Sequence, residues 1–209
     1  MFRDRAEAGR QLAQKLLQYR GKSAVVLALP RGGVVLGFEV ARVLSAPLDI
    51  IAVRKIGHPT SPEYAIGAVD ESGARILNEA EAAGVDQHWL TKETEREVAE
   101  AKRRSSVYRG GKIPESLAGK VVILVDDGIA TGLTMRLAVR SVRAQKPEKI
   151  IVAVPVAPTD SFEVLKDEGA DEVVVLEPPE EFAGAVGAHY VRFDQVEDEE
   201  VVALLRNAG

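Results

Sequence analysis

Five short apolar runs constrain the fold of this chain most strongly. They span residues 23–29, 48–53, 120–125, 149–154 and 172–176 and consist largely of valine, isoleucine and leucine. Strands that are apolar throughout, without alternation, are typical of a parallel sheet that is covered by helices on both faces. The sequence therefore predicts an α/β fold, a Rossmann-like parallel sheet of about five strands flanked by helices.

Segments with helical periodicity precede and separate these runs. Asp4 and Glu7 have the spacing of a capping box, and an apolar stripe follows them, which predicts a helix over residues 4–20. Further helices are predicted over residues 34–44, 133–145, 161–168 and 198–207. The stretch 66–118 is longer than one crossover requires. Its start predicts a small antiparallel flap around Glu71, and its charged centre, 91–104, predicts an exposed helix.

Composition limits the class of protein. The 209 residues are 46% hydrophobic and fit one domain, 1–209. The chain contains no cysteine, which excludes disulfides and thiolate catalysis, and it has no apolar run of membrane-spanning length. A net charge of -5 disfavours a general nucleic-acid surface. We therefore expect a cytoplasmic protein without membrane or nucleic-acid partners, and we expect His58, His88 and His189 to be structural or surface residues.

Two adjacent acids follow the third run. Asp126 and Asp127 precede a loop with two glycines and two threonines, and a helix is predicted to begin near Thr134. Glycines let successive backbone N–H groups point inward, and a helix N-terminus adds positive potential, which together favour phosphate binding. Carboxylates beside such a loop can accept hydrogen bonds from sugar hydroxyls or hold water on Mg²⁺. The arrangement suggests ribose 5-phosphate as a ligand, although a single aspartate there could simply cap the helix.

The stretch "VVILVDDGIATGLT", residues 121–134, resembles the phosphoribosyl diphosphate (PRPP) motif of type I phosphoribosyltransferases. The resemblance implies that family's fold, with a small hood or flap. It also implies that Asp126 and Asp127 are catalytic, hold the ribose hydroxyls and bind Mg²⁺ through water. The residues that would grip the 5-phosphate are Ala130, Thr131, Gly132, Leu133 and Thr134.

A second loop agrees with this resemblance. "PRGG", residues 30–33, follows the first run at the position of the family's pyrophosphate loop, which implies that Arg31, Gly32 and Gly33 bind diphosphate, with Arg31 also catalytic. Glycines free backbone N–H groups to approach an anion, and Arg31 offers a planar donor fork. Arg54 and Lys55 end the second run and are expected to join them. A tight turn and a solvated pair of cations are the alternative interpretations of these two features.

The remaining segments are predicted to frame the substrates. The family's mobile loop would fall within 66–118, where Tyr108 and Arg109 are candidate diphosphate ligands. The family's acceptor hood would fall within 178–209, where Phe182, Tyr190 and Phe193 could either stack an acceptor or pack on the core. The acids of that segment that could receive the acceptor's proton are Glu180, Glu181 and Asp194.

The resemblance implies a magnesium-dependent enzyme of nucleotide metabolism that transfers phosphoribosyl from PRPP to a nitrogenous base or similar small acceptor and releases diphosphate. It also allows a homodimer. Ala130 stands where purine-salvage members often carry an acid, so we expect hypoxanthine and guanine to be poor acceptors. A non-catalytic sensor of PRPP or nucleotides, or a phosphoribosyl hydrolase, remain the alternatives.

Overall fold

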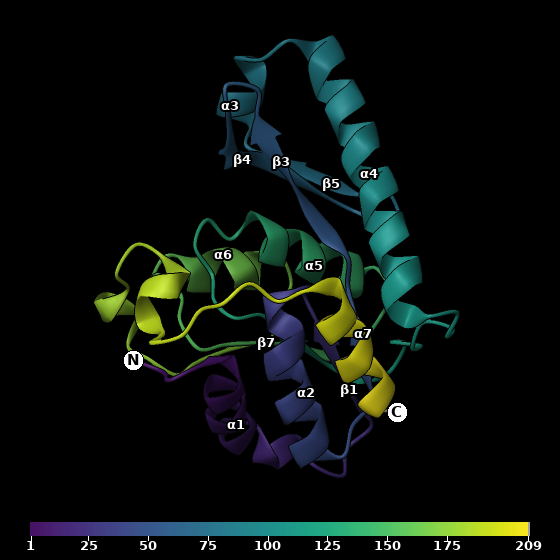
Figure 1. Ribbon diagram of the computed structural model, residues 1–209, viewed down its shortest axis with the longest axis vertical. Helices are drawn as coiled ribbons and strands as arrows, with labels where there is room; N and C mark the ends of the chain where they lie inside the picture. Colours follow the sequence, from purple (N-terminus) through teal and green to yellow (C-terminus); the bar gives the residue numbers. More distant parts are fainter. Residues whose placement is uncertain (209) are drawn as a thin grey trace.

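A parallel five-stranded sheet forms the centre of the computed structural model, which describes residues 1–208 without the side chain of Pro179. The strand order is β2-β1-β6-β7-β8 (Figure 1). The strands are β1 (Ala24–Ala28), β2 (Leu48–Ile50), β6 (Val121–Val125), β7 (Lys149–Val154) and β8 (Glu172–Val175). The predicted fold class and the five strands are confirmed, except that β2 ends at Ile50 and the chain leaves the sheet there.

Helices cover both faces of this sheet, as the apolar strands predicted. α1 (Arg5–Lys15), followed by η1 (Leu17–Tyr19), packs with α2 (Gly32–Leu44) on one face. The other face carries α5 (Leu133–Arg143) and α6 (Ser161–Asp167). Neighbouring strand residues point to opposite faces, so Val26 of β1 joins the α1–α2 side and Val25 the α5–α6 side.

The N-cap of α1 forms as the sequence predicted. The Asp4 side chain accepts a hydrogen bond from the backbone N–H of Glu7 at 2.9 Å. The Glu7 carboxylate accepts in return from the backbone N–H of Arg3 at 2.6 Å. Since these groups satisfy N–H donors at the start of the helix, they fix where α1 begins and therefore where its first side chain, Arg5, points.

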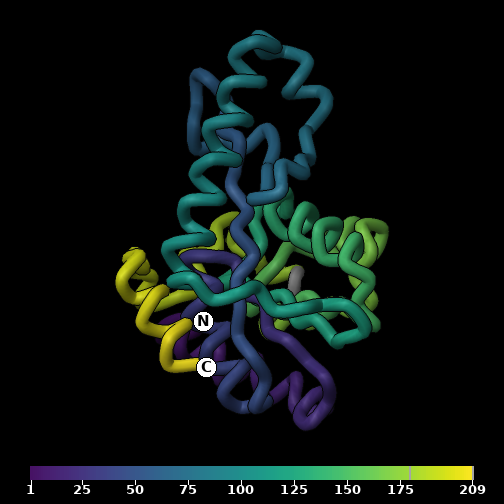
Figure 2. Tube along the Cα trace, turned by 90° about the vertical axis from the view of Figure 1, so that its right-hand side faces the viewer, coloured from purple at the N-terminus to yellow at the C-terminus, as the bar shows by residue number. Residues whose placement is uncertain are grey.

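A second, antiparallel sheet projects from the core (Figures 1 and 2). Its order is β3-β4-β5, and the chain then forms α3 and the long helix α4, which runs back to the core. Their bounds are β3 (Val53–His58), β4 (Ser61–Asp70), β5 (Arg75–Leu77), α3 (Glu79–Ala83) and α4 (Gln87–Arg109). The predicted antiparallel pair and charged helix are present, but this unit begins at Val53, before the predicted insertion of 66–118. The mobility of the insertion stays a prediction.

The C-terminal end of α4 is tied to the core by polar contacts. The hydroxyl of Tyr108 donates to Asp198 at 2.6 Å, and burial raises the pKa of Tyr108 to about 12. Arg109 donates to Asp49 at 2.9 Å and to the Ile50 carbonyl at 2.8 Å. Both side chains therefore serve to fix α4.

The N-terminal residues pack against the segment around Tyr190 beside the sheet. Phe2 and Tyr190 form a parallel bridge, and the N–H of Phe2 donates to the carbonyl of His189 at 2.8 Å. The C-terminal segment contains η2 (Pro179–Glu181), η3 (Val186–His189) and α7 (Asp198–Asn207). The N-terminal residues are thus part of the predicted hood region.

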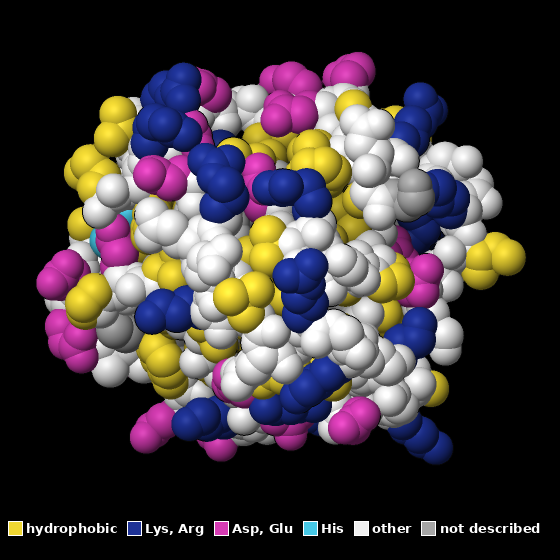
Figure 3. Space-filling model, turned by 90° about the horizontal axis from the view of Figure 1, so that it is seen from below, with side chains coloured by type: hydrophobic (Ala, Val, Ile, Leu, Met, Phe, Trp, Pro, Cys, Tyr) yellow, Lys and Arg dark blue, Asp and Glu magenta, His cyan; other side chains and the backbone are white. Residues whose placement is uncertain are grey.

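Charges are interspersed on the face seen from below, which lies on the side of α1 and α2 (Figure 3). Lysine and arginine side chains alternate there with acidic and apolar ones among the residues drawn in colour. Within residues 1–208, no helix combines the length and apolar character that crossing a bilayer would require.

The contact between Tyr108 and Asp198 gives a stability prediction. Tyr108→Phe should lower the free energy of unfolding by about 1.5 to 3 kcal/mol, because a buried hydrogen bond to a charged group is lost. The matched control is Tyr64→Phe, since Tyr64 is 47% exposed and donates to Glu81 at 3.1 Å. Denaturant unfolding should show little change for the control, and equal losses in both variants would contradict the assignment.

Candidate active site

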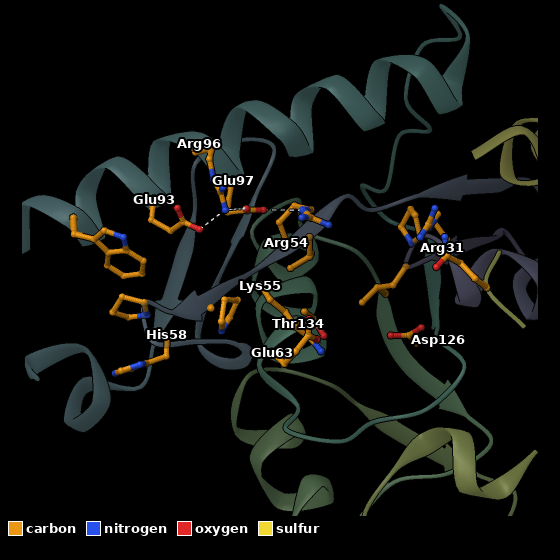
Figure 4. A pocket seen from close by; sticks show the side chains of 18 residues that line it. Arg31, Arg54, Lys55, His58, Glu63, Glu93, Arg96, Glu97, Asp126 and Thr134 are labelled. Carbon is orange, nitrogen blue, oxygen red and sulfur yellow. Dashed lines mark hydrogen bonds and ion pairs between the residues drawn. The ribbon is translucent and has the colours of Figure 1, made fainter. Parts of the chain in front are cut away.

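A cleft of about 850 Å³ opens where the carboxyl ends of β1 and β6 face the small sheet and α4 (Figure 4). Parallel sheets commonly bind ligands at this edge. Its predicted site residues are Arg31, Arg54, Lys55, Asp126 and Thr134. Further lining residues that the sequence did not single out for binding are Pro30, Glu63, Trp89, Glu93, Arg96, Glu97 and Gln195, with His58. The structure therefore brings residues from three separate predicted loops into one cavity.

Asp126 faces this cleft from the end of β6. Its Oδ1 accepts a hydrogen bond from the backbone N–H of Asp127 at 2.8 Å, and no ion pair within residues 1–208 involves it. Burial and the neighbouring Asp127 charge raise the pKa of Asp126 well above its usual value. Such a carboxylate is suited to accept hydrogen bonds from ligand hydroxyls or to approach a cation.

Asp127 has a different environment and is not among the residues that line the cleft. Its Oδ2 accepts from Nε of Arg5 at 2.7 Å, and its backbone carbonyl accepts from the Tyr190 hydroxyl at 2.7 Å. Burial raises the pKa of Asp127, whereas the Arg5 charge opposes that shift. The two acids, predicted as an equivalent pair, therefore differ in their partners.

The PRGG loop lies directly against the acids. A Cβ at Gly32 would come within 2.0 Å of Asp127 Oδ2, and one at Gly33 within 2.7 Å of the Val125 carbonyl oxygen. Glycine is thus required here by close approach, in addition to its proposed role in exposing N–H groups. α2 begins at Gly32, so the N-terminus of a 13-residue helix adds positive potential at this end of the cleft. The Pro30–Arg31 peptide bond is cis.

The three predicted cations all line the cleft, Arg31 from the loop after β1 as expected, but Arg54 and Lys55 from an unexpected element. Arg54 and Lys55 lie within β3, not at the end of a strand of the main sheet. Nε of Arg54 donates to buried Glu97 at 2.8 Å, and Arg31 lies 3.5 Å from Glu197. Among the ion pairs of residues 1–208, none involves Lys55.

The predicted 5-phosphate loop precedes α5. Gly132 has a φ of +77°, which favours glycine, and α5 begins at the next residue. Thr134 lines the main cleft, whereas Ala130, Thr131 and Gly132 line another pocket of about 370 Å³ together with Phe182. The side chain of Leu133 is buried against the small sheet, so only its backbone is available to a ligand.

Other predicted residues lie away from the cleft. Tyr108 and Arg109 do not line it, because both are engaged at the end of α4 as described above. Phe182 stacks on His189 at 5.5 Å between ring centres, and Tyr190 packs between Phe2 and Phe193.

Besides the lining residues named above, sequence reasoning did not place Arg5 or His58 at the site. Arg5 carried no signal, because 122 residues separate it from Asp127. His58, expected to be a structural or surface residue, lines the cleft beside Pro59 and Glu63. Within residues 1–208, no group of three or more histidine, aspartate or glutamate side chains could hold a metal ion by itself.

Comparison with known proteins agrees with this geometry, in which strand-end acids and a glycine loop share one cleft of an α/β fold. The sequence pattern of the phosphoribosyl transferase domain matches residues 3–190. The chain belongs to the phosphoribosyl transferase domain family.

Two relatives resemble the chain over its whole length. A Mycobacterium tuberculosis protein named "Putative phosphoribosyl transferase Rv0571c" is 46% identical over 211 residues, covering 100% of this chain but 47% of its own length. The chain thus spans about half the length of the curated relatives it matches. The crystal structure of TT1426 from Thermus thermophilus is 44% identical and superimposes with a TM-score of 0.80 over 99% of this chain and 98% of that one.

A more distant structure shares the fold alone. The hypothetical protein from Neisseria gonorrhoeae with bound ppGpp is 14% identical, with a TM-score of 0.50 over 100% of this chain and 99% of that one.

The environment of Asp126 gives a prediction on stability and pH. Asp126→Asn keeps the shape of the side chain and the accepting Oδ1 but removes a partly buried charge. The unliganded variant should therefore melt at least a few degrees higher than the wild type at neutral pH, since 1 kcal/mol of stability corresponds to about 2 to 4 °C in melting temperature. A carboxyl whose pKa is raised in the folded state destabilises the fold above the unfolded pKa. The advantage of the variant should therefore vanish near pH 4, where the unfolded carboxyl protonates (about 3.9), and grow as pH rises.

The control for this measurement is Asp167→Asn, which removes an exposed carboxylate on α6. Its melting temperature should follow the wild type across the same pH range. A lower melting temperature for Asp126→Asn at neutral pH would show that the Asp126 charge stabilises the fold.

Proposed function

We propose that the protein transfers the 5-phosphoribosyl group from PRPP to a nitrogenous base or similar small acceptor and releases diphosphate. The observation that carries this proposal is the cleft itself. Asp126, an acid without an ion pair among residues 1–208, shares it with Arg31, Lys55 and Thr134, from four separate elements or loops. Membership of the family supports the same reaction class.

In the proposed reaction, the bond between C1 of the ribose and the diphosphate oxygen breaks, and its electron pair leaves with the diphosphate. A nitrogen of the acceptor forms the new bond to C1 and passes its proton to a carboxylate of the C-terminal segment, for which Glu180, Glu181 and Asp194 are the candidates. Arg31, Lys55 and the N–H groups at the start of α2 stabilise the negative charge that develops on the leaving group. Asp126 orients the ribose hydroxyls, and the backbone N–H groups and threonine hydroxyls of residues 131–134 hold the 5-phosphate.

Magnesium fits this site. The ion usually binds one or two carboxylates together with water and substrate phosphates, which agrees with a strand-end carboxylate at the cleft, Asp126, and no complete metal cluster within residues 1–208. Asp126 would hold it through water, with Asp127 beside it. When bound, Mg²⁺ would supply positive charge that neutralises the diphosphate.

The direct test is to incubate the protein with Mg²⁺, PRPP and a panel of bases and to follow diphosphate release. Release that depends on one base would support the transferase. Release without any base would indicate a hydrolase, and tight PRPP binding without release would indicate a sensor. Within the panel, we expect hypoxanthine and guanine to be poor acceptors, because Ala130 supplies no proton acceptor and general-base help is worth about 100-fold to 10,000-fold in rate.

Two substitutions should separate the two phosphate subsites. Lys55→Met should weaken binding of inorganic diphosphate, and Thr131→Val should weaken binding of ribose 5-phosphate. Each loss should be about 10-fold or more, since a hydrogen bond to a charged group is worth about 1.5 to 3 kcal/mol. Each variant should leave the other ligand unaffected, and both should weaken PRPP binding.

Calorimetry with Mg²⁺ present measures all three ligands. Lys92→Met and Thr91→Val, which change exposed residues of α4, are the matched controls and should bind like the wild type. If either test variant loses both partial ligands together, the assignment of the two loops is wrong.

A further inference from the structure

Arg5 is a cation held by three contacts next to the acid pair. Its side chain is only 11% exposed. Nε donates to Asp127 Oδ2 at 2.7 Å, Nη1 donates to the Asp194 carbonyl at 2.6 Å, and the guanidinium lies 3.8 Å above the centre of the Phe193 ring. A planar guanidinium can make these contacts at once, whereas the ammonium of a lysine cannot.

The contact between Arg5 and Asp127 is enclosed by a third segment. A Cβ at Gly32 would lie 2.0 Å from Asp127 Oδ2 and 2.9 Å from Nε of Arg5, so the PRGG loop packs directly on the ion pair. The Tyr190 hydroxyl holds the backbone of Asp127 from the C-terminal segment. The start of α1, the PRGG loop and residues 190–194 therefore meet at one carboxylate.

We propose that Arg5 is a positioning residue of the site: it holds Asp127 between the PRGG loop and residues 190–194, and so couples the order of the C-terminal segment to binding at the cleft. The inference rests on the proposed function only for the identity of the ligand, PRPP. Because Arg5 engages Asp127, the neighbouring Asp126 is left as the carboxylate that faces the cleft. Coupling between the cleft and residues 190–194 must be reciprocal. PRPP binding should therefore order residues 190–194.

Three variants test this role. Arg5→Met removes the charge and the hydrogen bonds but keeps a long apolar side chain, and Arg5→Lys keeps the charge alone. Arg10→Met is the matched control, because Arg10 lies on the same helix, is 43% exposed and pairs with Glu39 at 3.2 Å. Each is examined by calorimetry with PRPP and Mg²⁺, by thermal melting and by amide hydrogen exchange over residues 190–194.

Arg5→Met should weaken PRPP binding at least ten-fold at a temperature where it is folded, and should accelerate exchange at residues 190–194. Arg5→Lys should recover part of the affinity but leave the exchange fast, since lysine cannot also reach the Asp194 carbonyl and stack on Phe193. PRPP should slow exchange at 190–194 in the wild type and in Arg10→Met, but not in Arg5→Met.

A folded Arg5→Met that binds PRPP like the wild type would overturn the proposal, even if its melting temperature falls, because that result shows a structural role alone. If Arg5→Met does not fold, Arg5→Lys takes its place in the test. Wild-type PRPP affinity of Arg5→Lys, together with wild-type exchange rates at residues 190–194, would overturn the proposal. Failure of the wild type to bind PRPP would instead contradict the proposed function. In that case, the exchange rates without ligand still test whether Arg5 orders residues 190–194. Wild-type exchange rates at these residues in Arg5→Met would reject that role.

Discussion

The partial burial of two adjacent carboxylates at the end of β6 is the constraint on which the rest of the site depends. Loss of hydration raises the pKa of both acids, and the Asp127 charge raises the pKa of Asp126 further. The surrounding groups offset this cost more fully for Asp127 than for Asp126. Asp127 has a cation, a backbone tether and a loop packed on it, whereas the only hydrogen bond to the Asp126 carboxylate within residues 1–208 comes from the N–H of its neighbour. Of the two strand-end acids, the one that lines the cleft is thus the less compensated, and such a loss of stability is common at functional sites.

The main sheet determines which groups surround these acids. β1 and β6 pair in parallel with Ala28 opposite Val125, and the N–H of Leu29 donates to the Val125 carbonyl at 2.9 Å. Both strands therefore end at the same level, and the PRGG loop must cross directly beside the acids. The two glycines allow this crossing, because a side chain at Gly32 would overlap the Asp127 carboxylate. The same packing that builds the core thus places a helix N-terminus next to the acid pair.

Features with a local signal were predictable from the sequence, and features made by distant contacts were not. The five strands, the Asp4 cap and the acids at the end of β6 follow from patterns of a few residues. The exit of the chain after Ile50 could not be predicted, since β3 continues an apolar run but pairs with β4 instead. Tyr108 and Arg109 resembled residues of a mobile loop, yet their partners Asp198 and Asp49 lie far along the chain. Arg5 and His58 reach the site only through the tertiary fold.

The small sheet also changes how the predicted cations can act. Arg54 donates through Nε to Glu97, which is buried and also accepts from Arg96 at 3.0 Å. A guanidinium has five N–H donors, so one bound through Nε to Glu97 keeps the two terminal nitrogens for a ligand, in a fixed orientation. In the proposed reaction, this arrangement reduces the side-chain entropy lost when diphosphate binds, while Lys55, free of ion pairs among residues 1–208, supplies the less restrained charge. A site with one pre-oriented and one mobile cation can hold its leaving group tightly in one geometry and still release it.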